Sequence, residues 1–302
     1  MLVYWLFRLT IVLMRPLPLW LGYRVAAAVA EICYHFFHRQ RRALNENMAW
    51  VLGSNDRRQV DAVARRAFRN FGKFVIDFIH FPVMSREEVR RRLVFHQWPE
   101  LDEVMASKRG MLIVTMHYGV YDLGGAALAA YDYPTNAIGE NYGYKKMDRL
   151  IHGSRERLGM KVIPVERVGP GVFRALKRGE ILALAIDVPP PDQTILVDFL
   201  GAPAEVSSTP ARIALRTGAW VVPAIVFRGP ESDSLIRPIL DTRSVRYEPT
   251  GSEERDVYAL TRLIMASFEQ HIREHPEQWF IFRRVWPHLA QEHQAGAIAQ
   301  EA

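Results

Sequence analysis

The residues best suited to chemistry are a histidine and an aspartate that lie five positions apart, His117 and Asp122. The apolar run Met111–Thr115 predicts a buried strand, and the residues from Val120 onward predict a helix. His117 would then lie at the carboxyl end of a strand, where open α/β sheets bind their ligands. Asp122, in the first turn of the helix, could hold one imidazole tautomer and favour the protonated ring. Gly119 between them would let a substrate approach the backbone.

This pair has no obvious nucleophile beside it. The sequence contains no GxSxG motif, and its one cysteine, Cys33, is distant from His117 along the chain. A histidine–aspartate pair alone suits direct transfer, in which His117 deprotonates an acceptor hydroxyl that then attacks an activated acyl group. General-base assistance of this kind contributes about 10²–10⁴-fold to a rate. The structural alternative is a hydrogen-bonded histidine beside a helix terminus.

The elements that would position the pair alternate between strand and helix after Glu100, which predicts an α/β fold with a largely parallel central sheet flanked by helices. The apolar runs expected as strands are Met111–Thr115, Thr135–Gly139, Lys161–Val165, Ile181–Ile186, Ile195–Leu200 and Trp220–Phe227. Helices are expected over residues 56–81, 120–130, 145–158, 170–178, 210–217 and 253–274. We therefore divide the chain into helices over residues 1–42, a larger domain over 43–288 (helical over 43–99, α/β over 100–288) and a flexible tail over 289–302.

Residues 1–38 are apolar but interrupted by charge, with no uncharged run near the roughly 18–20 residues that cross a bilayer. On a helix, Arg8 and Arg15 share a face opposite Trp5, Leu9 and Val12, as in a helix that lies in a membrane interface. A basic cluster follows directly, made of Arg39, Arg41 and Arg42. This order predicts peripheral or monotopic attachment to the cytoplasmic face of the cell (inner) membrane. The alternative is two ordinary helices packed on the domain.

The overall composition limits the class of protein. The chain has 302 residues, 49% of them hydrophobic, and a formal net charge of +6. A single cysteine excludes a disulfide framework. The basic charge suits phosphate-bearing partners such as anionic lipids, a coenzyme or an acidic carrier protein. Nucleic acid is disfavoured, because the arginines are scattered and no zinc-finger or RNP-like pattern occurs.

Six sequence blocks, in order, resemble the lysophospholipid acyltransferase superfamily and, more narrowly, the lipid A late acyltransferases and phosphatidylinositol mannoside acyltransferases. The blocks are Ala43–Met48, Met116–Asp122 (like the family's HxGNWE or HxGNWD), Ile138–Glu140 with Ser154–Gly159, Gly179–Asp187, Val197–Gly201 with Pro210–Pro223, and His275–Phe280 with Arg283 and Arg284. The chain departs from the pattern where Val120 and Tyr121 replace Asn-Trp and where Val188 follows Asp187. Its Asp122 in place of Glu leans towards the phosphatidylinositol mannoside branch.

This resemblance implies further site residues. Arg155 and Asp187 would belong to the active site, with Arg157 as the second choice for the arginine, and Glu140 would bind acceptor hydroxyls. The basic residues of the same predicted helix would also bind substrate; they are Lys145, Lys146 and Arg149. A structural salt bridge is the alternative for Arg155 and Asp187.

The resemblance implies a membrane-associated O-acyltransferase. It would move a fatty acyl chain from acyl-CoA or acyl carrier protein to a hydroxyl of a glycolipid or phospholipid, of the phosphatidylinositol mannoside or lipid A type. Its partners would be membrane lipids of the cytoplasmic leaflet and the acyl donor, and neither a cofactor nor a metal is expected. Two alternatives stay open: a thioester hydrolase using the same pair, and a non-catalytic membrane-binding protein. The motif from His271 to His275, HxxEH, also matches a zinc-binding pattern, but Pro276 ends the helix at once.

Overall fold

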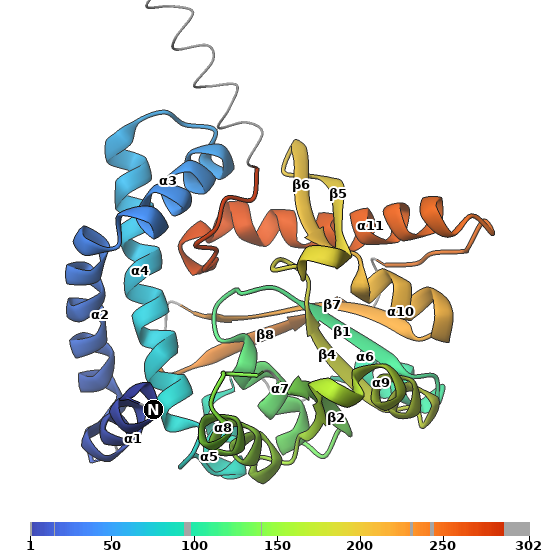
Figure 1. Ribbon diagram of the computed structural model, residues 1–302, viewed down its shortest axis with the longest axis horizontal. Coiled ribbons are helices and arrows are strands. Elements are labelled where there is room, and N and C mark those ends of the chain that lie inside the picture. The colour runs from blue at the N-terminus through green and yellow to red at the C-terminus, as the bar shows by residue number, and fades with distance from the viewer. Residues whose placement is uncertain are drawn as a thin grey trace, which may run out of the picture.

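A twisted six-stranded sheet forms the centre of the molecule (Figure 1), in the order β3-β2-β4-β1-β7-β8. The computed structural model describes residues 2–14, 16–93, 98–139, 141–229, 232–241 and 245–286. The strands are β1 (Met111–Thr115), β2 (Thr135–Gly139), β3 (Lys161–Pro164), β4 (Ile181–Ala185), β7 (Trp220–Arg228) and β8 (Ile236–Leu240). Neighbouring strands of this sheet pair in parallel, except that β7 pairs antiparallel with the edge strand β8. The predicted α/β class with a largely parallel sheet is confirmed.

Helices cover both faces of this sheet, which is why its central strand β1 is a continuous apolar run. One face packs on α5 (Arg86–Arg92), α6 (Pro99–Ala106) and α7 (Tyr121–Ala130). The other packs on α9 (Val168–Lys177), α10 (Thr209–Thr217) and the long α11 (Glu253–Glu274). The small side chains of α7 let it lie close to the sheet: the Cβ position of Gly124 would come within 2.4 Å of the Val226 side chain.

One predicted strand belongs elsewhere. The run Ile195–Leu200 corresponds to β5 (Thr194–Phe199), which pairs antiparallel with β6 (Ala202–Ser207) in a separate hairpin and not in the main sheet. Only Leu200 and Gly201 connect the two strands, and both have positive φ, 54° and 90°. A two-residue connection of this handedness closes a hairpin and cannot make the long crossover that a parallel neighbour needs.

The part of the chain before β1 that the structure describes is mostly helical. It contains α1 (Leu2–Met14), α2 (Leu19–Phe36), α3 (His38–Leu52) and α4 (Arg57–His80). In Figure 1, α2 lies along α4 at one side of the sheet, and the two backbones touch where a Cβ on Gly72 would lie 2.8 Å from the Ala26 carbonyl oxygen. Asp56 caps the N-terminus of α4, since its carboxylate accepts from the Arg58 amide at 2.9 Å.

The outer face of α1 and α2 exposes large apolar side chains. They include Trp5, Leu9, Val12, Trp20, Val29, Ile32 and Phe36, each more than half exposed. Among the residues that the structure describes, no helix combines the length and the apolar character that crossing a bilayer would take.

Candidate active site

Strand order brings His117 beside Asp187. β1 and β4 are parallel neighbours with Thr115 opposite Ala185, so the two site residues each lie two positions beyond the end of that register. The His117 Nδ1 atom lies 2.8 Å from Asp187 Oδ1, and the His117 backbone N–H donates to Asp187 Oδ2 at 2.9 Å. Asp187 thus contacts the histidine through both its carboxylate oxygens.

Asp187 is almost completely buried, whereas the His117 side chain is 30% exposed. Burial by itself would raise the pKa of the Asp187 carboxyl. The facing charge of His117, the hydrogen bonds from its ring and backbone, and a bond from the Trp279 indole together hold that pKa below its usual range. An ionised carboxylate only accepts hydrogen bonds, so Nδ1 of His117 carries the proton towards Asp187.

Asp122, which its place in the sequence predicts to be the group that orients His117, forms an ion pair with Arg155. The Arg155 Nη2 atom lies 2.9 Å from Asp122 Oδ1, and the two side chains are only 5% and 12% exposed. The carboxylate at Nδ1 of His117 is that of Asp187, a residue that only the family resemblance assigns to the active site. The Asp122–Arg155 pair ties the first turn of α7 to α8 (Lys145–Arg157), close behind the loop that carries His117.

The loop after β1 is fixed by its backbone. The Gly119 amide donates to the Gln278 carbonyl and the Val120 amide to the Val226 carbonyl, each at 2.7 Å. Gly119 has φ +60°, and a Cβ there would lie 2.0 Å from the Val226 oxygen. The space that we expected a substrate to use at Gly119 is therefore filled by β7, and glycine is required because no side chain fits.

The other predicted binding residues that the structure describes all belong to α8. Arg157 is exposed and donates to the Phe81 carbonyl at 2.9 Å. Lys145, Lys146 and Arg149 are exposed on α8. Glu140, directly after β2, lies outside the described residues.

Aromatic side chains that sequence reasoning did not assign lie in a row beside His117. The Tyr121 ring is 5.1 Å from the imidazole and stacks on Phe74 at 5.0 Å. Phe74 is 6.3 Å from Phe78, and Phe78 is 5.9 Å from Phe7 of α1. Phe71, Phe74 and Phe78 recur at helical spacing, which indicates that they share one helix face but not which part of the sheet that face meets.

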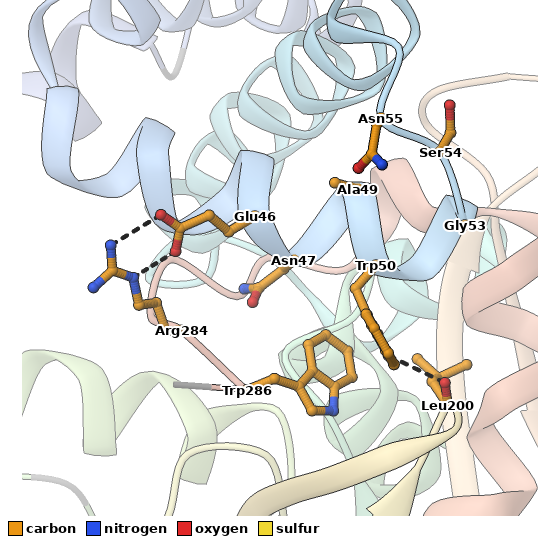
Figure 2. Close-up of a pocket in the computed structure, with 10 residues that line it drawn as sticks. All are labelled: Glu46, Asn47, Ala49, Trp50, Gly53, Ser54, Asn55, Leu200, Arg284 and Trp286. Atoms are coloured by element: carbon orange, nitrogen blue, oxygen red, sulfur yellow. Dashed lines mark hydrogen bonds and ion pairs between the residues drawn. The ribbon is translucent and has the colours of Figure 1, made fainter. Parts of the chain in front are cut away.

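A separate pocket of about 650 Å³ opens between α3 and the chain segment after α11, and neither His117 nor Asp187 lines it (Figure 2). Within the described residues, no group of three or more histidine, cysteine or acidic side chains is placed to hold a metal ion. The backbone carbonyls of His271 and His275, from the HxxEH motif, accept hydrogen bonds from the Tyr118 hydroxyl at 3.1 and 3.2 Å.

Comparison with known proteins gives one consistent result. Three curated relatives named phosphatidylinositol mannoside acyltransferase are each 24% identical to this chain. Those of Mycobacterium tuberculosis (strains CDC 1551 / Oshkosh and H37Rv) align over 260 residues, 84% of this chain and 79% of the relative. That of Mycolicibacterium smegmatis aligns over 252 residues, 80% and 78% respectively. Residues 1–288 match the family described as bacterial lipid A biosynthesis acyltransferase. Because this family match covers nearly the whole chain, including His117 and Asp187, the chain belongs to the bacterial lipid A biosynthesis acyltransferase family and is an enzyme that transfers acyl groups.

Proposed function

We propose that this enzyme transfers a fatty acyl chain from a thioester to a hydroxyl of a glycolipid at a membrane surface, with His117 as general base and Asp187 as the group that orients it. The observation that carries the proposal is the 2.8 Å contact between His117 Nδ1 and the buried carboxylate of Asp187. A partner fixed at Nδ1 leaves Nε2 as the nitrogen that accepts a proton.

The reaction needs only one proton acceptor of this kind. Nε2 of His117 takes the proton of the acceptor hydroxyl as its oxygen attacks the thioester carbonyl carbon. The carbon–sulfur bond then breaks, and the imidazolium returns the proton to the departing thiolate. Asp187 stabilises the imidazolium during the step without taking its proton. No cofactor is needed, because the thioester supplies the activated acyl group.

For the Asp122–Arg155 ion pair we assign a positioning role. The pair is nearly buried and joins α7 to α8, so it holds the start of α7, and with it the loop between β1 and α7, in a fixed position. The exposed basic residues of α8 suit the phosphates of a coenzyme, the acidic surface of a carrier protein or a phosphorylated headgroup. Arg157, at the end of the same helix, is the weaker of these binding candidates because its guanidinium already donates to Phe81.

A glycolipid acceptor of the phosphatidylinositol mannoside type is favoured by the curated relatives that carry that name. Glu140 would hold acceptor hydroxyls, since it directly follows β2, two strands from β1 in the sheet. A lipid A-like acceptor is the other member of the class that the family suggests.

Membrane attachment through α1 and α2 is the second part of the proposal. The apolar outer face of these helices lies beside the basic start of α8, where the Lys146 ammonium is 5.9 Å from the Trp5 ring centre. Apolar rings next to cationic groups are typical of an anionic membrane interface. The row Phe7, Phe78, Phe74 and Tyr121 offers an acyl chain an apolar path from that face to His117. Because acyl thioesters are made in the cytoplasm, we place the enzyme on the cytoplasmic leaflet.

The test is thiol release from palmitoyl-CoA, and separately from a palmitoylated carrier protein, with and without a total lipid extract. Wild type should release thiol only with the extract, and mass spectrometry of the acylated lipid would identify the acceptor. His117→Ala should lower the rate about 10²–10⁴-fold. His38→Ala, which truncates an exposed histidine, is the matched control and should leave it unchanged. Full transfer by His117→Ala contradicts the mechanism, and release without any lipid identifies a hydrolase.

A further inference from the structure

The segment that follows α11 runs along the carboxyl edge of the sheet beside His117. We call residues 276–285 the C-terminal strap. The Gln278 carbonyl of the strap accepts from the Gly119 amide. The Phe280 amide of the strap donates to the His117 carbonyl at 2.8 Å. The Gln278 side-chain amide accepts from the Arg228 backbone N–H at 2.9 Å and donates to the Arg228 carbonyl at 3.0 Å. The strap is thus joined to the His117 loop on one side and to β7 on the other.

From this strap, the Trp279 side chain reaches Asp187. Its indole N–H donates to Asp187 Oδ2 at 3.1 Å, and the side chain is completely buried. The same oxygen accepts the His117 backbone N–H, so two donors hold Oδ2 while Oδ1 faces the His117 ring. A carboxylate held at one oxygen by two donors cannot turn freely about its Cβ–Cγ bond.

The strap itself has little freedom to move. The Arg283 guanidinium donates to the carbonyls of Asp187 and Glu205, each at 2.6 Å. The side-chain amide of Asn47 on α3 donates to the Ile281 and Arg283 carbonyls, at 3.2 and 2.7 Å, and accepts from the Val285 amide at 3.1 Å. Figure 2 shows Asn47 on α3 facing the segment that carries Arg284 and Trp286. A lost indole donor could not be replaced by a shift of the strap.

We infer that Trp279 is a positioning residue for acyl transfer, whose indole N–H fixes the Asp187 carboxylate in the orientation that holds His117 ready to accept a proton. This inference rests on the proposed function of His117 and Asp187. Trp279 acts through Asp187, and its removal should weaken the chemical step more than substrate binding.

The experiment compares Trp279→Phe with Trp286→Phe in the full-length chain. Phenylalanine keeps an aromatic ring and removes the N–H donor. Trp286 is the matched control because it is also buried, packs in the same cluster on Phe199, and its indole nitrogen has no hydrogen-bond partner among the described residues. Trp279→Phe should lower kcat about 10- to 100-fold with little change in KM, the loss expected for a hydrogen bond to a charged group. Trp286→Phe should stay within about threefold. Thermal unfolding checks that both variants fold, and Trp279→Phe should lose more stability because it also removes a hydrogen bond to a buried charge.

Equal kcat losses in the two variants would overturn the inference, because both would then report only damage to the aromatic cluster. A second arm adds Trp279→Phe to Asp187→Asn. If Trp279 acts through Asp187, it should cost less than about threefold in that background. An undiminished cost in the double variant would also overturn the inference.

A spectroscopic arm separates this inference from the proposed function. With ¹⁵N-labelled histidine, the His117 signals are assigned by their loss in His117→Ala, and their shifts report which ring nitrogen is protonated. We expect the Nδ1-protonated form to dominate in wild type and in Trp286→Phe, and a larger share of the Nε2-protonated form in Trp279→Phe. An unchanged tautomer in Trp279→Phe contradicts the inference even if transfer is found. A changed tautomer supports it even if the acceptor is not a glycolipid.

Discussion

Two aspartates in this protein are about equally buried, Asp77 in the N-terminal helical region and Asp187 at the edge of the sheet. Asp77 of α4 accepts from the Tyr23 hydroxyl at 2.7 Å and from Arg92 Nη2 at 2.6 Å, and it also pairs with Arg228 of β7. Burial would raise the pKa of either carboxyl, but the facing cations and hydrogen bonds hold both pKa values below the ordinary range. Neither burial nor a depressed pKa distinguishes the two sites.

The difference lies in the partners. Asp77 faces the buried Tyr23 hydroxyl and two arginines, which are themselves buried and keep their protons at any ordinary pH. Asp187 faces one titratable histidine that is partly open to solvent, and its other donors are a backbone amide and an indole. The first site joins α2, α4, α5 and β7 into one body. Only the second has a titratable partner that is open to solvent, so we expect only it to exchange a proton with a bound substrate.

The strongest test of this contrast is Asp187→Asn. An amide has nearly the same shape, but it cannot fix the Nδ1-protonated tautomer or stabilise an imidazolium, so transfer should fall about 10³–10⁴-fold. Thiol release in the presence of lipid measures the loss, and circular dichroism checks the fold. If the variant kept more than a tenth of the wild-type rate, Asp187 would be a structural carboxylate like Asp77.

For Asp77→Ala the large effect should be on stability. The change leaves Arg92 and Arg228 buried without a counter-ion, which costs about 3–5 kcal/mol of unfolding free energy. Urea denaturation followed by fluorescence gives this value. The rate per folded molecule should stay near that of wild type. A selective loss of transfer in fully folded Asp77→Ala would remove the distinction between the two sites.

A smaller effect is expected from Asp122→Asn, which breaks the pair with Arg155. If this pair only positions the loop, kcat should fall by about tenfold, well short of the loss in Asp187→Asn. Asp132→Asn, which breaks an exposed pair with Arg86 (2.6 Å), is the control and should leave transfer unchanged. Equal losses in Asp122→Asn and Asp187→Asn would return the orienting role to Asp122.

The smallest expected effect, and the one that depends most on pH, is the effect of Glu180 on stability. Burial opposes its ionisation, but hydrogen bonds from Arg178, Lys161 and Asn136 lower its pKa from 4.5 to about 2. A depressed carboxyl pKa contributes stability that is present above the unfolded value and lost as pH falls through the folded one. Glu180→Gln should therefore be less stable than wild type above about pH 4.5, and the gap should close towards pH 2. Since Arg178 and Lys161 are about half exposed, the gap should be modest and shrink in salt. A gap that persists at pH 2 would contradict this assignment.

Local features of the sequence determined most of the secondary structure. The strands of the main sheet at Met111, Thr135, Lys161, Ile181 and Trp220 begin where their apolar runs predict, and α11 spans the predicted residues. The same reasoning placed His117 at the carboxyl end of a strand, which the structure confirms. Apolar runs, helical periodicity and capping residues act over a few positions, so a single sequence contains enough information for them.

The partners of these elements were decided by the tertiary structure. His117 meets Asp187, 70 residues away, because β4 is one of the two neighbours of β1 and pairs with it so that Thr115 lies opposite Ala185. Asp122 is closer in sequence, but its carboxylate pairs with Arg155 of α8. β5 carries the same apolar pattern as the sheet strands, yet its two-residue connection commits it to a hairpin. The Asp77 cluster and the Trp279–Asp187 bond join segments 151 and 92 residues apart. Which groups meet depends on strand order and on packing across the whole chain. The spacing of neighbouring residues determines neither of them.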